Sequence, residues 1–104
     1  MLIDSATREL LIHIMSINSL VPEDVVSVIF TVTDDLRSEF PARAARALGW
    51  TDVPLLCTVE IPVPGALARC VRVLLHVETT RARSSMRHVY LRGARSLRPD
   101  LNTD

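Results

Sequence analysis

The sequence predicts one small domain of the α+β or α/β class, and three observations support this. The chain has 104 residues, which suits a single domain spanning residues 1–104. Hydrophobic residues make up 48% of it and aromatic residues only 4%, so we expect a folded chain with an aliphatic core. The apolar pattern switches between the helical period and the strand period along the chain, in the order helix, strand, helix and then three strands.

Two helices are expected from the spacing of apolar and helix-limiting residues. Residues 2–17 place apolar side chains at three- and four-residue steps, at Ile3, Ala6, Leu10, Ile14 and Ile17. Pro22, followed by two acidic residues, is typical of the start of a short turn of helix. Pro41 begins an alanine-rich helix that Gly49 ends.

Four strands are expected after the first helix. Each is rich in β-branched and aliphatic residues, and together they cover 25–33, 53–63, 70–80 and 86–97. Pro64 and Gly65 turn the chain between the second and third strands. Residues 98–104 are expected to form a tail.

Composition excludes several classes of function. The formal net charge is zero, which does not favour a general nucleic-acid binder. No stretch is long and apolar enough to span a membrane, and the acidic N-terminal segment is unlike a signal peptide, so a cytoplasmic location is the default expectation. All twelve basic residues are arginines, so lysine Schiff-base chemistry is ruled out and every cation is a planar fork suited to carboxylates or phosphates.

No metal or cofactor is predicted. Cys57 and Cys70 are thirteen positions apart, and the three histidines also lack metal-ligand spacing. The three glycines are too few for a phosphate-binding loop. Two buried, reduced thiols are the expected state of the cysteines.

Arg72 is the most informative residue, because it stands within an apolar strand and an arginine cannot lose its charge to enter a core. By the period of two, the third strand separates one mixed face from one aliphatic face. The mixed face holds Arg72, Leu74, His76 and Glu78, and the aliphatic face holds Val71, Val73, Leu75 and Val77. The fourth strand places His88, Tyr90 and Arg92 on one face.

Two interpretations of these polar faces stay open on the pattern alone. They are either the solvated side of a half-exposed sheet, or the wall of a pocket built from Arg72, Tyr90 and Glu60. A Glu60–Arg72 ion pair would satisfy both charges and is the structural alternative to a ligand site. In either case the residues offer charged and hydroxyl groups but no credible nucleophile.

Several ordered motifs resemble those of one family. They are "FPARAAR", the spaced pattern from Cys57 to Val73 that contains "EIPVPG", and "RHVYL" followed by "LRPDL". Over about residues 22 to 101 the chain resembles the trimeric α/β chorismate mutases, the class that is not a helical bundle. The resemblance implies a mixed β-sheet with helices packed on it, assembled as a pseudo-α/β-barrel homotrimer with active sites between subunits.

The resemblance also implies the activity and its chemistry. The family converts chorismate to prephenate in aromatic amino acid biosynthesis, the shikimate pathway, by a Claisen rearrangement without cofactor or covalent intermediate. Such a reaction needs the ligand held in a reactive conformer, with cationic donors where the breaking ether oxygen gathers charge.

Residue roles are carried over by motif. Arg72 corresponds to the arginine at the ether oxygen and a substrate carboxylate, Glu60 to the glutamate at the ring hydroxyl, and Tyr90 to the tyrosine at the enolpyruvyl carboxylate. Cys57 corresponds to a cysteine near the ring hydroxyl, and Leu56 and Thr58 flank it. The neighbouring subunit is expected to contribute Phe40, Arg43 and Arg46, and the C-terminal segment contributes Leu97 and Arg98.

The family's first strand, of the type "RGIRGAT", has no counterpart in "MLIDSATREL". We therefore expect a chain truncated relative to the family, with an exposed sheet edge and without that strand's substrate-binding arginine. The alternatives to a fully active mutase are a weakly active or inactive homologue, a binding or assembly module, and an enzyme for a related enolpyruvyl acid. A start site chosen too late would also explain the missing strand.

Overall fold

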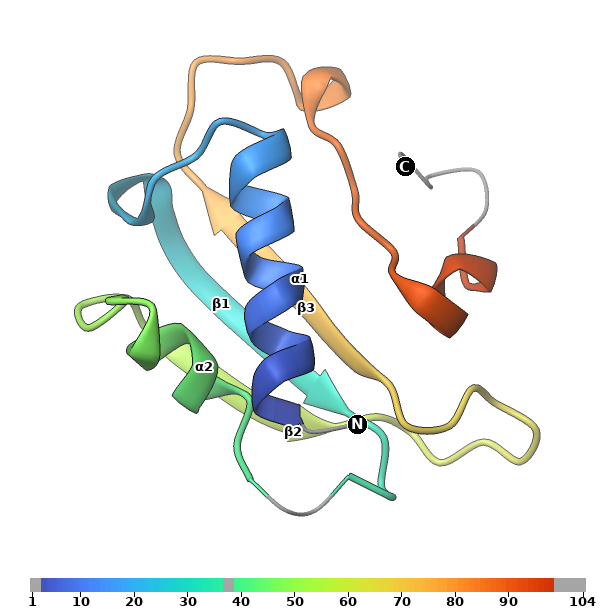
Figure 1. The fold of residues 1–104 in the computed structure, drawn as a ribbon. Coiled ribbons are helices and arrows are strands. Elements are labelled where there is room, and N and C mark those ends of the chain that lie inside the picture. The colour runs from blue at the N-terminus through green and yellow to red at the C-terminus, as the bar shows by residue number, and fades with distance from the viewer. Residues whose placement is uncertain (1–2, 37–38, 99–104) are drawn as a thin grey trace.

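One three-stranded sheet with helices on one face forms the centre of the fold (Figure 1). The computed structural model describes residues 3–36 and 39–98. The strand order is β2-β1-β3, for strands β1 (Val25–Val32), β2 (Leu55–Val59) and β3 (Val71–Val77). Because β1 runs parallel to β2 and antiparallel to β3, the sheet is mixed, and the predicted α+β class is confirmed.

Helix α1 (Ile3–Ile17) agrees with the predicted helix and crosses the sheet diagonally (Figure 1). Its apolar surface divides between two environments. The fully buried side faces the core through Ile3 and Leu11. The other residues of the predicted stripe are only half-buried, and Leu10 and Ile14 among them line a cavity.

Helix α2 (Ala42–Ala47) lies on the same side of the sheet as α1. It is short because a cap ends it at its C-terminus. Gly49 has φ +93° and donates its N–H to the Arg46 carbonyl at 3.0 Å. The Trp50 N–H reaches back to the Ala45 carbonyl at 3.1 Å, which completes a Schellman cap. Gly49 therefore ends the helix as predicted, since an L-residue would be strained at this φ. The α1 helix contacts α2 across this layer.

The core lies between the helices and the sheet. Val28 and Phe30 of β1 point into it and are almost fully buried. The helices supply Leu11, Ala42 and Ala45, and the segment before β2 supplies Trp50 and Val53. Small alanines on α2 let this helix approach the strands closely, so aliphatic groups fill the interior with few aromatic rings.

The opposite face of the sheet is not covered by a helix in the described part of the chain. Ile29 and Thr31 of β1 point to this face, with Leu56 beside them on β2 and Leu74 on β3. More than half of the Leu56 and Leu74 side chains is exposed. The sheet therefore presents an apolar surface that the described residues leave open, and the mixed face predicted for β3 lies on it.

The fourth predicted strand, 86–97, is wrong. Residues 86–91 run as an irregular segment, and residues Arg92–Ser96 form a short 3-10 helix. Arg92 has φ +52°, which is incompatible with a continuing strand. Among the described residues the sheet consequently ends at β3.

The second predicted strand, 53–63, is shorter in the structure, where β2 covers Leu55–Val59. Its partner β1 stops at Val32, so the last backbone contact is the Glu60 N–H to the Val32 carbonyl at 2.8 Å. Pro62 then has no N–H to offer a neighbouring strand. Residues 60–63 therefore leave the sheet and are mostly exposed.

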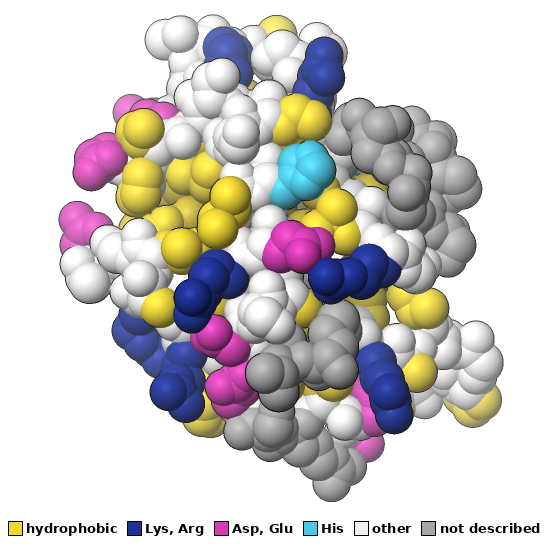
Figure 2. All heavy atoms as spheres, viewed as in Figure 1, with side chains coloured by type: hydrophobic (Ala, Val, Ile, Leu, Met, Phe, Trp, Pro, Cys, Tyr) yellow, Lys and Arg dark blue, Asp and Glu magenta, His cyan; other side chains and the backbone are white. Residues whose placement is uncertain are grey.

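Charged side chains of both signs are mixed across the face that carries α1 (Figure 2). Blue and magenta groups lie beside one another there, and no continuous basic stripe crosses this view. Within the described ranges, none of the helices has the length and apolar character needed to cross a membrane.

The packing predicts that Phe30→Ala lowers the free energy of unfolding by about 3–5 kcal/mol, because it opens a cavity in a fully buried site. Ile12→Ala on the exposed side of α1 is the matched control and should change it by less than about 0.5 kcal/mol. Urea denaturation followed by circular dichroism measures both. Equal losses in the two variants would contradict this account of the core.

Candidate active site

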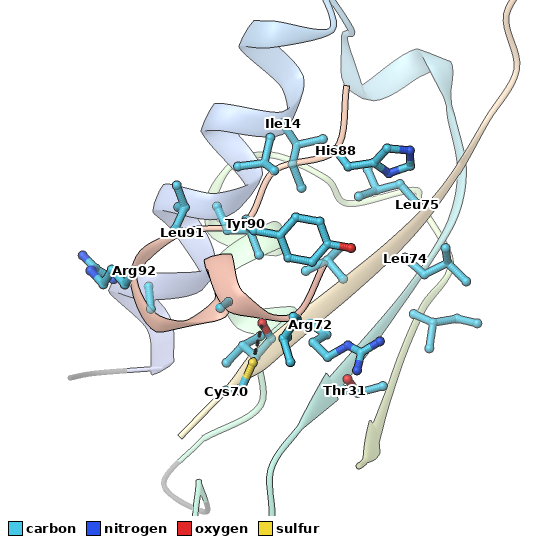
Figure 3. A pocket seen from close by; sticks show the side chains of 18 of the residues that line it. Ile14, Thr31, Cys70, Arg72, Leu74, Leu75, His88, Tyr90, Leu91 and Arg92 are labelled. Atoms are coloured by element: carbon cyan, nitrogen blue, oxygen red, sulfur yellow. Dashed lines mark hydrogen bonds between the residues drawn. The ribbon is translucent and has the colours of Figure 1, made fainter. Parts of the chain in front are cut away.

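A cavity of about 770 Å³ opens along the free edge of β3 (Figure 3). One wall is β3 itself, a second is the half-buried stripe of α1, and a third is the segment from Met86 to Ala94. Because neither β3 nor this segment is paired with the other as a strand, the space between them stays open. The walls combine many aliphatic side chains with a smaller set of polar and charged ones.

Arg72, Glu60 and Thr31 form one polar cluster in this cavity. The register places Thr31 of β1 opposite Arg72 of β3, so both side chains project from the same face of the sheet. Arg72 Nε lies 3.5 Å from Glu60 Oε2, and the Thr31 hydroxyl donates a hydrogen bond to the same carboxylate oxygen. The expected Glu60–Arg72 pair is thus present in the structure.

The Arg72–Glu60 pair leaves most of the guanidinium open to a ligand. The Arg72 side chain is 57% exposed and the Glu60 side chain 25%, so water screens their attraction. Pairs this exposed contribute at most about 1 kcal/mol. Arg72 carries five N–H donors, and the contact with Glu60 engages Nε at its base. A carboxylate ligand can therefore bind to the outer nitrogens without first breaking a strong ion pair.

Tyr90 reaches the cavity from the segment that faces β3. Figure 3 shows its ring extending from this segment and its hydroxyl projecting toward the same side as the Arg72 guanidinium. The sequence predicted a pocket wall built from Arg72, Tyr90 and Glu60, and all three line the cavity. The strand predicted for Tyr90 is absent, so an irregular segment brings it there instead.

Positive charge predominates around the cavity. Its lining includes Glu60 and the arginines Arg69, Arg72, Arg83, Arg87 and Arg92. One of them, Arg92, is neutralised by Glu9 of α1, at 2.9 Å between Nη2 and Oε2. The excess of cations still favours an anionic ligand, because a partly apolar cleft strengthens the field of its charges.

Cys70 also lines the cavity but is unsuited to act as a nucleophile. Burial raises the pKa of the Cys70 thiol, with a smaller opposing effect from Arg72. A thiol that stays protonated at neutral pH is weakly nucleophilic. Its Sγ lies 3.9 Å from the Val71 carbonyl oxygen, as the dashed line in Figure 3 shows. The cavity therefore holds charge and hydrogen-bonding groups rather than an activated nucleophile.

Asp35 fixes the start of the strand that carries Arg72. Its carboxylate accepts a hydrogen bond from the Thr33 hydroxyl at 2.5 Å and from the Arg69 N–H at 3.1 Å. Arg69 has φ +51°, so this contact holds a left-handed residue just before β3. The Thr33 hydroxyl in turn accepts from the Cys70 N–H at 2.9 Å. These bonds tie the end of β1 to the start of β3.

The residues predicted around Cys57 separate onto the two faces of the sheet. Leu56 pairs with Ile29, and Thr58 with Thr31, so both lie on the open face with Arg72. Cys57 pairs with the buried Phe30 and packs against the core. The Cys57 side chain thus points away from the cluster, and a contact between this thiol and a ligand is not supported by the geometry.

The residues expected from the neighbouring subunit do not line this cavity. Phe40 is 68% exposed, and Arg43 and Arg46 are exposed on α2. Helix α2 contacts β2, which is the strand farthest from β3. Of the two predicted C-terminal residues, Leu97 lines the cavity and Arg98 is exposed nearby in the chain.

Sequence reasoning missed Thr31 and the apolar wall of α1. Thr31 lies in an apolar run, and only the register with Arg72 and Thr58 reveals its place beside Glu60. The helical period did mark Ala6, Leu10 and Ile14, but as a core stripe. Across residues 3–36 and 39–98, no group of three or more His, Cys, Asp or Glu side chains is arranged to hold a metal.

The Asp35 contacts predict a pH-dependent contribution to stability. The Thr33 hydroxyl, with the Arg69 N–H, holds the pKa of Asp35 below its usual value of 3.8. Stability from this carboxylate is therefore present above that value and is lost as pH falls through the lower, folded-state pKa. Asp35→Ala should lower the urea midpoint at pH 7, and the difference from the parent should shrink at pH 3 and below.

The exposed Asp52, in the turn before β2, is the control for this measurement, and Asp52→Ala should leave the midpoint unchanged at both pH values. A difference between parent and Asp35→Ala that grew on acidification would contradict the assignment.

Comparison with known proteins identifies the family. The model of the family "Chorismate mutase type I" matches residues 1–101. Chorismate mutase AroH of Thermus thermophilus is 51% identical over 102 residues, which cover 97% of this chain and 84% of that protein. Chorismate mutase AroH of Bacillus subtilis is 44% identical over 97 residues, covering 92% and 76%.

The fold leads to the same family. A solved chorismate mutase from Clostridium thermocellum superposes with a TM-score of 0.89 at 47% sequence identity, covering 90% of this chain and 84% of that one. The sequence and the fold therefore point to the same family. The chain belongs to the type I chorismate mutase family.

Proposed function

We propose that the protein rearranges chorismate to prephenate, with the substrate bound at the Arg72–Glu60–Tyr90 cluster. The observation that carries this proposal is the combination of an exposed arginine, a carboxylate and a tyrosine in one cationic cavity. A sigmatropic rearrangement needs no nucleophile, so a protein accelerates it by holding the reacting conformer and by stabilising the charge that develops. The relatives named above are chorismate mutases, which supports the same reaction.

In this proposal Arg72 binds a substrate carboxylate and the ether oxygen that becomes negative as its bond to carbon breaks. A permanent guanidinium is suited to this role because it needs no proton transfer and is already in place before the reaction. Glu60 accepts a hydrogen bond from the ring hydroxyl, and Thr31 fixes the orientation of its carboxylate. Tyr90 donates to the enolpyruvyl carboxylate from the facing wall of the cavity.

We further propose that the working form is a homotrimer with sites between subunits. Phe40, Arg43 and Arg46 belong to the β2 side of the fold, whereas Arg72 and Tyr90 belong to the β3 side. A contact between these two sets therefore requires a second copy. An interface of two different surfaces closes into a ring when the rotation allows it, and a threefold ring is the smallest such assembly beyond a dimer.

The open sheet face supports association as well. Leu56 and Leu74 are exposed on it, together with the half-buried Ile29. Contiguous apolar surface of this kind marks an interaction site more often than a free surface. We propose that a neighbouring subunit covers this face and presents Phe40, Arg43 and Arg46 beside the substrate.

The first activity prediction concerns Arg72. Arg72→Ala should lower kcat for chorismate by at least about 100-fold, because the charge on the ether oxygen loses its main partner. Arg72→Lys should also fail, since one ammonium cannot reproduce a two-pronged fork. Loss of chorismate absorbance measures the rate, and circular dichroism checks the fold.

Arg81→Ala is the control for Arg72, because Arg81 is exposed and lies outside the cavity lining. It should retain the parent rate. If Arg72→Ala rearranged chorismate as fast as the parent, the assignment of the site would be wrong. A parent chain with no rate above buffer, but with tight binding of a transition-state mimic, would favour a binding module instead.

The second activity prediction concerns the shared site. Arg72→Ala and Arg46→Ala should each be nearly inactive as pure proteins. Co-expression of the two variants should restore activity, because some sites combine an intact Arg72 with an intact Arg46 from a neighbour. With random mixing in a ring, about a quarter of the sites regain both residues.

Mixing Arg72→Ala with Tyr90→Phe is the control, since both residues come from one chain's cavity. This mixture should not regain activity. Every chain in it carries one of the two changes in its own cavity, so every site stays defective. Recovery in neither mixture would exclude a site divided between Arg72 and Arg46. Sedimentation equilibrium on the parent protein tests the trimer independently.

A further inference from the structure

Residues 87–92, which carry Tyr90, are attached at both ends to helix α1 and the residue that follows it. At one end, Arg87 makes backbone hydrogen bonds with the Asn18 side chain. At the other end, Arg92 pairs with Glu9 of α1 at 2.9 Å. The cavity separates the stretch between these points from β3. The position of Tyr90 relative to Arg72 therefore depends on how this segment is held to α1.

Asn18 is unusually well suited to hold a backbone segment. It is 5% exposed and directly follows the last residue of α1. Its Oδ1 accepts from the Arg87 N–H at 2.7 Å, and its Nδ2 donates to the Arg87 carbonyl at 2.9 Å. The side-chain amide thus pairs with Arg87 as a neighbouring strand would. The same Nδ2 donates to the Ile14 carbonyl at 2.9 Å, which fixes the amide to the helix.

The two attachments differ in strength. Glu9 and Arg92 are both about half exposed, so water screens their ion pair and its contribution is at most about 1 kcal/mol. The Asn18 bonds are short and run in both directions, and the side chain that makes them is 5% exposed, so water competes with them less. Asn18 is therefore the attachment that sets where the segment lies.

We propose that Asn18 is a positioning residue for the reaction, acting through Tyr90. It fixes the backbone at Arg87, three residues before Tyr90, and so holds the Tyr90 hydroxyl on the same side of the cavity as Arg72. The proposal rests on the function proposed above for Tyr90. An error of about 1 Å in placing such a group costs about 100-fold in rate.

Asn18→Ala should lower kcat/KM for chorismate by about tenfold to 100-fold. Asn18→Asp keeps the size and the acceptor, but turns an oxygen toward the carbonyls of Ile14 and Arg87, so it should lose a similar factor. It serves as the second variant if the alanine variant does not fold. Ser16→Ala, on the exposed side of the last turn of α1, is the matched control and should keep the parent rate.

A double-mutant cycle with Tyr90→Phe separates positioning from a general structural role. If Asn18 acts through Tyr90, the effect of Asn18→Ala should fall to less than about twofold once the hydroxyl is gone. The same factor in both backgrounds would overturn the Asn18 proposal alone. Parent kinetics in Tyr90→Phe would instead overturn the role assigned to Tyr90 under the proposed function.

The single tyrosine of the chain allows a test without substrate. After incorporation of 3-fluorotyrosine, one ¹⁹F resonance reports the surroundings of Tyr90. Asn18→Ala should shift or broaden this resonance, whereas Ser16→Ala should leave it in place. Identical spectra for Asn18→Ala and the parent would contradict the proposal.

Discussion

The register between β1 and β3 is the constraint on which the site depends. Val73 and Leu75 pack against the core, and because successive side chains of a strand alternate, Arg72 must project to the opposite face. A slip of one residue would turn a permanent charge into the aliphatic interior and expose two core residues. That slip is excluded because Phe30 on the neighbouring strand is buried, which fixes the face of the sheet that packs on the core. Core packing thus determines where the charge points before any ligand is present.

The Arg72 guanidinium on that face is held by weak contacts, so it stays available to a ligand. Glu60 and Thr31 set the direction of the Arg72 side chain, but the ion pair is exposed and weak. A buried pair would hold the guanidinium more firmly, and a ligand would then have to break it. The Asp35 contacts supply the rigidity instead, because they fix the backbone where β3 begins. The Asp35 contacts therefore fix the backbone of β3, whereas the weak pair with Glu60 leaves the Arg72 side chain available to a ligand.

Local patterns predicted the parts of the site that depend on a short-range period. The two faces of β3 and the Gly49 helix end follow from neighbouring residues, and both are present. The segment carrying Tyr90 could not be predicted this way, although its composition suits a strand. Its backbone partner is the side chain of Asn18, 69 positions away, and no local period signals such a contact. The face of β2 that carries Cys57 is likewise decided by the pairing of Cys57 with Phe30, which no local pattern shows.

The division of the proposed site between the two edges of the sheet links association to catalysis. Arg72 and Tyr90 lie at the β3 edge, and Arg46 lies on the helix that contacts β2, so in the proposed trimer one copy would present two separate parts of the site. The exposed leucines between these edges supply an apolar driving force for docking, while the arginines contribute mainly to the binding of an anion. In the proposed trimer the same docking would bring the two sets of residues together, so the assembly that buries the open sheet face would also complete the proposed site.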